Sequence, residues 1–156
     1  GRRDFISLRR VAISNFLLIM LLSFFFAFFF IATHDFLPWL YLNGNSPDIS
    51  SDVFEVVEIA SNLILIAAFF QIADGVQAVV LGALRGIQDV MIPALLIFFS
   101  YGIIGFPISY YLGLKTDWST SGIWIGLLTG LLLSSILLVF RFQYLSQKLI
   151  PLTQKK

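Results

Sequence analysis

Long apolar runs alternate with short polar connections along this chain. The runs that carry at most one charged residue cover residues 11–33, 59–84, 90–112 and 122–140. Each is long enough to cross a hydrocarbon layer, which takes about 20 helical residues. Backbone groups inside a bilayer must find hydrogen bonds within their own segment, so each run is predicted to be a transmembrane helix. The expected fold class is therefore an all-α membrane protein with four transmembrane helices.

Composition supports a membrane protein and disfavours several other classes. The chain is 58% hydrophobic and only 12% charged, too few polar residues to cover a soluble domain of this size. A net charge of +1 without a dense basic cluster gives no basis for binding nucleic acid. One histidine and no cysteine are too few for a hydrolytic triad or a thiolate site, so we do not expect an enzyme.

The positive charges are distributed unequally between the two sides of the predicted helices. Nine of the ten Lys and Arg residues lie before the first run, between the second and third runs, or in residues 141–156. Only Lys115 lies in the connections on the other side. Because positive residues remain on the cytoplasmic side, both ends of the chain are predicted to be cytoplasmic, with 141–156 as a cytoplasmic tail. The aromatic residues expected at the outer boundary are Trp39, Tyr41, Tyr110, Tyr111, Trp118 and Trp124.

Asp74 is the most unusual residue within the apolar runs. It lies 11 residues before Arg85, or roughly 16 Å along a helix from the cytoplasmic boundary, close to the bilayer midplane. A carboxylate at that depth costs about 2.5 to 3.5 kcal/mol on insertion scales, so it should face protein or water. Gln71 and Gln77 share its helix face. The functional interpretation is a cation or proton site, and the structural alternative is a hydrogen bond between helices.

Small residues and prolines predict how the helices pack. Gly122, Gly126, Gly130 and Ser134 recur every four residues in the last run, and Ala78, Gly82 and Gly86 do so in the second. Such ladders allow close helix approach, which is an architectural role. At the hairpin between the second and third runs, Gly86 is expected to end one helix and Asp89 to cap the next, with Pro93 in its first turn. Pro107 is expected to bend the third helix.

Motif order over about a hundred residues resembles the multidrug and toxic compound extrusion (MATE) family of cation-coupled antiporters. The matching segments are FQIADGVQAVVLGALRGIQDVMIP, SYGIIGFPISYYLG and SGIWIGLLTGLLLSSILLVFRF. The residues that carry the resemblance in register are Gly82, Arg85, Gly86, Asp89, Pro93, Tyr101, Gly105, Pro107, Tyr110, Gly122, Trp124 and Arg141. The chain is similar to the last four of that family's twelve helices, part of the C-terminal six-helix lobe.

The resemblance implies efflux of small cationic or amphiphilic substrates, driven by inward flow of Na⁺ or H⁺ across a cell inner membrane. It requires no other cofactor. Asp74 matches the acid that binds the coupling cation and would be a metal ligand in a sodium-coupled member. Phe70, Gln71, Gln77 and Tyr101 are candidate cavity-lining residues. The remaining eight helices of the transporter and the bilayer are the expected partners.

Two alternatives stay open at this point. The chain is also compatible with a non-transporting four-helix assembly subunit that the glycine ladders hold together. A lipid-linked precursor flippase of the same superfamily is the other, although no cationic residue lies near the predicted midplane. One departure from the family concerns Phe70, because sodium-type members often have tyrosine one turn before the acid. The choice between sodium and proton therefore stays open.

Overall fold

The chain is a bundle of long helices in a computed structural model, which describes residues 5–42 and 51–154. The long helices are α1 (Phe5–Thr33), α3 (Ser51–Gly86) and α6 (Ser119–Gln154). The third span is built from α4 (Met91–Phe98), the π-helix η1 (Phe99–Gly105) and α5 (Phe106–Lys115). A short helix, α2 (Leu37–Leu42), follows α1 and was not predicted from the sequence.

Within the described ranges, four helical segments are long and apolar enough to span a membrane, which confirms the predicted fold class. They are Ser7–Thr33, Val53–Gly86, Met91–Lys115 and Ser119–Leu149. The helices extend beyond the apolar runs because polar residues at their ends continue the same backbone hydrogen bonding. Residues 141–154 of the predicted tail continue α6 as a helix. With 36 residues, α6 is about 54 Å long, more than a bilayer requires.

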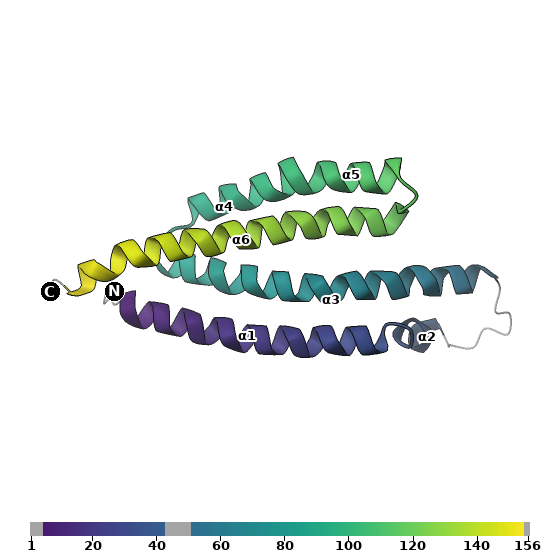
Figure 1. Ribbon diagram of the computed structural model, residues 1–156, viewed down its shortest axis with the longest axis horizontal. Coiled ribbons are helices and arrows are strands. Elements are labelled where there is room, and N and C mark those ends of the chain that lie inside the picture. The colour runs from purple at the N-terminus through teal and green to yellow at the C-terminus, as the bar shows by residue number, and fades with distance from the viewer. Residues whose placement is uncertain (1–4, 43–50, 155–156) are drawn as a thin grey trace.

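The helices form two neighbouring hairpins (Figure 1). One hairpin joins α1 to α3, and the other joins the α4–η1–α5 rod to α6, with α3 and α6 packed against each other between them. The first turns of α1 and the last turns of α6 lie at the same end of the bundle, as four passes require (Figure 1).

The core is small and most of the apolar surface points outward. Val80, Leu84 and Leu138 form a buried cluster where α3 meets α6. By contrast, Phe28 and Phe98 are 72% and 70% exposed. In a soluble protein such surface would be unfavourable, but lipid tails are as apolar as these side chains. Close packing and polar contacts therefore hold the bundle together, rather than burial of apolar area from water.

The glycine ladder of α6 lies directly against the third span. A Cβ added to Gly122 would be 2.6 Å from the Leu112 carbonyl oxygen, and one added to Gly130 would be 3.1 Å from the Ser100 carbonyl oxygen. At Gly126 an added Cβ would collide with the backbone of Ser109. The expected close approach is thus present along α6.

The second ladder behaves differently. Nothing among the described residues lies within 4 Å of a Cβ added to Gly82, so the expected close approach does not occur there. At Gly86 an added Cβ would be 3.3 Å from Leu8 Cδ1. The tight contact between α1 and α3 lies instead at Gly75, where an added Cβ would be 2.7 Å from Ser23 Oγ.

The turn after α3 corrects one sequence-based expectation. The helix ends at Gly86 as predicted, but Gln88 adopts the left-handed conformation, with φ of 65°. The backbone N–H of Asp89 then donates to the Leu84 carbonyl at 3.0 Å. Asp89 does not cap α4, whose N-cap residue is Val90 and has no side-chain capping bond. The Asp89 carboxylate instead accepts a hydrogen bond from Arg141 Nε at 2.9 Å.

Pro107 follows the π-helical segment of the third span. The Phe106 N–H donates to the Tyr101 carbonyl, five residues earlier, as in a π-helix. Proline has no N–H and its ring crowds the carbonyl four residues before it, which is Ile103. Widening the turn before Pro107 relieves that conflict. Pro93, in contrast, lies in the first turn of α4 and is buried.

Candidate functional site

Asp74 lies about two thirds of the way along α3, twelve residues before its end, on the side that the other described helices leave open. Its neighbours along the helix turn toward the packed elements: Gly75 contacts α1, and the Ala73 carbonyl accepts a hydrogen bond from Ser135 of α6. Asp74 itself is exposed. Its expected shielding is therefore not supplied by the described part of this chain. It requires further protein or a water-filled cavity, because lipid is a poor environment for a carboxylate.

A polar network joins α3, the third span and α6 beside this carboxylate. Ser134 Oγ lies 2.7 Å from Gln77 Oε1 and 2.9 Å from the Leu131 carbonyl, and its proton is donated to these two acceptors. Tyr101 of η1 lies close enough to Ser134 and Asp74 to interact electrostatically with both. Ser134 is fully buried, so its hydrogen bond holds Gln77 of α3 against α6.

A second serine fastens α6 to α3 at the same level. Ser135 Oγ lies 3.0 Å from the Ala73 carbonyl and 2.8 Å from the Leu131 carbonyl. Ser135 is 4% exposed, and Ala73 directly precedes Asp74. Two adjacent hydroxyl groups on α6 thus hold the segment of α3 that carries the acid.

Aromatic residues close the site toward the other end of the bundle. Phe70 stacks edge-on against Trp124 of α6, with ring centroids 5.5 Å apart and an interplanar angle of 78°. Phe70 lies one turn before Asp74 on the same face of α3, and Gln71 beside it is half-buried. Three of the four candidate cavity residues lie on α3 within about one turn of Asp74, and the fourth, Tyr101, lies on η1.

The polar side-chain groups on this part of α3 and on α6 beside it present oxygen atoms: the Asp74 carboxylate, the Gln77 carboxamide oxygen and the Ser134 hydroxyl. Hard cations prefer oxygen ligands, and a carboxylate also accepts a proton. No group of three or more His, Cys, Asp or Glu side chains suited to a metal ion occurs among the described residues. A single carboxylate such as that of Asp74 can accept one proton or contribute one ligand to a cation.

The other motif residues lie away from Asp74. Arg85 is exposed in the last turn of α3, and Gly82 precedes it by one turn on open surface. Asp89 and Pro93 belong to the hairpin at that end, and Pro107 belongs to α5. These residues shape the bundle and do not reach the carboxylate.

Sequence reasoning treated Ser134 only as a small residue that continues the glycine ladder, and it did not single out Ser135. The available signal was a pair of hydroxyl residues in an otherwise apolar stretch, LLLSSILLVF. What could not be read was their pairing with Gln77 and Ala73, which are 57 and 62 residues away in the chain.

A second polar cluster lies at the other end of α3. His34 Nδ1 is 2.7 Å from Ser61 Oγ and 2.9 Å from Asp35 Oδ1, and Ser61 donates to that same oxygen at 3.0 Å. In a catalytic triad the acid binds the imidazole nitrogen opposite to the one that faces the serine. Here serine and aspartate contact the same nitrogen, so the cluster links the turn after α1 to α3 and does not form a triad.

Comparisons with known proteins agree with the motifs. The family model described as MatE matches residues 1–111. "Probable multidrug resistance protein NorM" of Xylella fastidiosa is 34% identical over 149 residues, covering 96% of this chain and 30% of that protein. "Multidrug resistance protein NorM" of Burkholderia vietnamiensis is 40% identical over 111 residues, covering 71% of this chain and 23% of that protein. The chain spans less than a third of these relatives, and it belongs to the MatE family, the multidrug and toxic compound extrusion family that its motifs resemble.

Proposed function

We propose that this chain supplies the cation-coupling part of a multidrug efflux antiporter. The observation that carries the proposal is Asp74, an acid well inside a membrane-spanning helix and one turn from Gln77, which Ser134 of α6 holds by a hydrogen bond. Secondary transporters place their coupling sites near the midplane, at an interface between repeats. Family membership and relatives named as multidrug resistance proteins support efflux as the activity. The chemistry is binding and release, not catalysis.

Coupling requires that cation binding favour one state of the transporter over another. In the proposed mechanism, a cation or proton neutralises the Asp74 carboxylate and lowers the cost of moving it into a dry interface. Its release into water restores the charge and favours the state in which the acid is hydrated. The network holds Gln77 in place, so that the carboxylate meets the same oxygen neighbours in each cycle.

The proposal includes the parts of the transporter outside this chain. The open face of α3 around Asp74 would meet other helices of the transporter, eight in the twelve-helix arrangement of the family. Substrates would be small amphiphilic or cationic molecules held in a cavity that Phe70, Gln71, Gln77 and Tyr101 border. The first turns of α1 and the last turns of α6 would lie on the cytoplasmic side of the inner membrane, and the asymmetry of Lys and Arg supports this orientation.

Replacing the acid in the full-length transporter tests this function. Asp74→Asn keeps the size of the side chain and removes its charge, so cation-driven efflux of a fluorescent dye from loaded proteoliposomes should be lost. The protein should still insert into the membrane at normal levels. Glu58→Gln is the matched control, because Glu58 is an exposed acid on the same helix, and its efflux should be unchanged. Persistent cation-dependent efflux in Asp74→Asn would disprove the assignment.

A further inference from the structure

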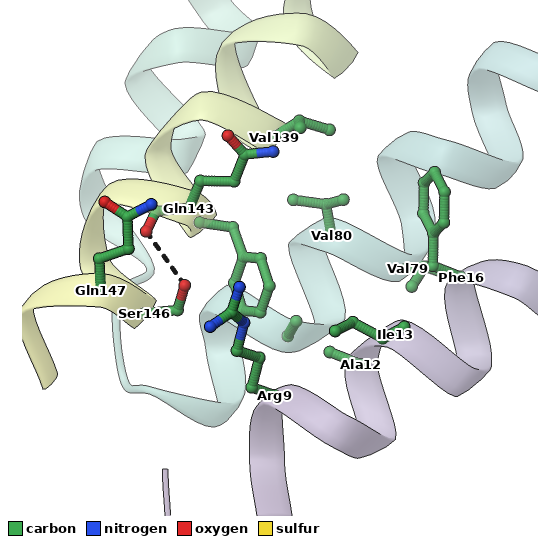
Figure 2. A pocket seen from close by; sticks show the side chains of 12 residues that line it. Arg9, Ala12, Ile13, Phe16, Val79, Val80, Val139, Gln143, Ser146 and Gln147 are labelled. Carbon is green, nitrogen blue, oxygen red and sulfur yellow. Dashed lines mark hydrogen bonds between the residues drawn. The ribbon is translucent and has the colours of Figure 1, made fainter. Parts of the chain in front are cut away.

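A crevice of about 400 Å³ lies between α1, α3 and α6 at the end of the bundle where the first turns of α1 are found (Figure 2). Its floor is apolar and includes Ala12, Val80 and Ala83. Its polar lining is confined to Arg9 of α1 and to Gln143, Ser146 and Gln147 of α6. Figure 2 shows the Arg9 side chain reaching from α1 toward the α6 side of the opening. The crevice is thus amphipathic, with a cationic rim over an apolar interior.

The crevice is on the opposite side of α3 from Asp74. Ala83 follows Asp74 by nine residues, which at 3.6 residues per turn places it about 180° around the helix. If the Asp74 face meets the rest of the transporter, the face with the crevice points away from that interface. Bilayer lipid is then the medium that lies against it. This step rests on the proposed function, as does the assignment of this end to the cytoplasmic leaflet.

The positive charge of Arg9 at the rim of the crevice favours anionic molecules among the lipids of the bilayer. Arg9 makes no ion pair with any described residue, although Arg141 farther along the bundle is paired with Asp89. A guanidinium binds phosphate oxygens in a bidentate manner, and amide side chains donate to the same acceptors. Basic pockets between helices on the cytoplasmic side bind the headgroups of anionic lipids. An acyl chain is suited to the apolar floor.

We infer that the crevice between α1, α3 and α6 is a binding site for an anionic phospholipid of the cytoplasmic leaflet. Arg9 binds the phosphate, Gln143 and Gln147 contact the headgroup, and one acyl chain lies over Val80 and Ala83. The lipid fills space that the three helices leave between them and ties the N-terminal end of α1 to the C-terminal half of α6.

Lipid retention by the full-length transporter tests the site. In native mass spectrometry of the detergent-solubilised protein, phosphatidylglycerol should be retained in preference to phosphatidylcholine. Arg9→Gln should weaken retention of phosphatidylglycerol about fivefold, the value of one cation at an anionic surface. Arg10→Gln is the matched control, because Arg10 is exposed on the same helix turn and does not line the crevice. Its retention should be unchanged.

Two further measurements test whether the lipid binds in the crevice rather than to surface charge in general, and whether lipid rather than another segment of the transporter occupies the crevice. Ala83→Trp fills the floor while leaving Arg9 in place, and it should reduce retention of both lipids. A photoreactive residue at position 13, on the rim of the crevice, should form an adduct with lipid. Equal phosphatidylglycerol retention in wild type and Arg9→Gln, or an equal loss in Arg9→Gln and Arg10→Gln, overturns the inference. So does an adduct between position 13 and another segment of the transporter.

Discussion

Arg141 Nε of α6 lies 2.9 Å from Asp89 Oδ2 in the connection between α3 and α4. The side chains are 24% and 16% exposed, so the pair is partly shielded from water. It joins the end of the first hairpin to the long helix of the second. The contact explains why both residues belong to the motif set although neither lies near Asp74.

Removing one member of this pair should destabilise the bundle. Asp89→Asn or Arg141→Gln leaves a shielded charge without its partner, at a cost of about 1 to 3 kcal/mol in the free energy of unfolding. The double variant should lose less than the sum of the two single losses, because the partners are in contact. Asp117→Asn, at an exposed acid, is the control. Additive losses in a denaturant titration would show that the pair contributes nothing.

The glycines of α6 and α3 should differ in their tolerance of a methyl group. Gly126→Ala places Cβ against the Ser109 backbone, so either the helices separate or the backbone shifts, at about 1 to 3 kcal/mol of stability. Gly82→Ala makes the same change where the described chain leaves open space, and it should be neutral or slightly stabilising because alanine favours helix. Thermal unfolding of the two variants in detergent compares them. Equal midpoints would contradict the packing seen at Gly126.

Substitutions of the two adjacent serines of α6 should have different effects, one on cation affinity and the other on the stability of helix packing. Ser134→Ala removes the hydroxyl that donates to Gln77, so cation affinity should fall about threefold, as expected for one interhelical hydrogen bond. Ser135→Ala removes a bond to the Ala73 backbone and should reduce stability by about 0.6 kcal/mol, with cation affinity retained. Cation-dependent efflux and unfolding are measured for both. The assignment of the network fails if Ser135→Ala changes cation affinity more than Ser134→Ala.

Adding a hydroxyl group at position 70 should alter the ion dependence of efflux. Phe70 lies one turn before Asp74, and its ring contacts Trp124 edge-on. Phe70→Tyr keeps the ring and adds an oxygen on the face of α3 that carries the acid. The sodium concentration for half-maximal efflux should therefore fall about fivefold, which corresponds to the free energy of one net hydrogen bond. Phe69→Tyr, at an exposed neighbouring phenylalanine, is the control. An unchanged sodium concentration for half-maximal efflux would show that the hydroxyl does not reach the cation.

The number of membrane-spanning helices was fixed by the sequence alone. Lipid requires continuous apolar runs and complete internal hydrogen bonding, and both conditions are local properties that a single pass along the chain can detect. The glycine spacing in α6 was informative for the same reason, because four-residue periodicity places small residues in line. Gly82 has the same spacing without the contact, because spacing reports a helix face and not what lies against it.

Tertiary structure decided the partners of the polar residues. Asp89 was expected to cap the helix that follows it, yet its carboxylate binds Arg141, which is 52 residues away in the chain. Ser134 and Ser135 became part of the candidate site only when α6 packed against α3. A buried hydroxyl or carboxylate takes whichever complementary group the packed helices bring within about 3 Å. The sequence located Asp74 as the acid within the apolar runs, whereas the three-dimensional arrangement determined that it faces the side of the bundle that the other described helices leave open.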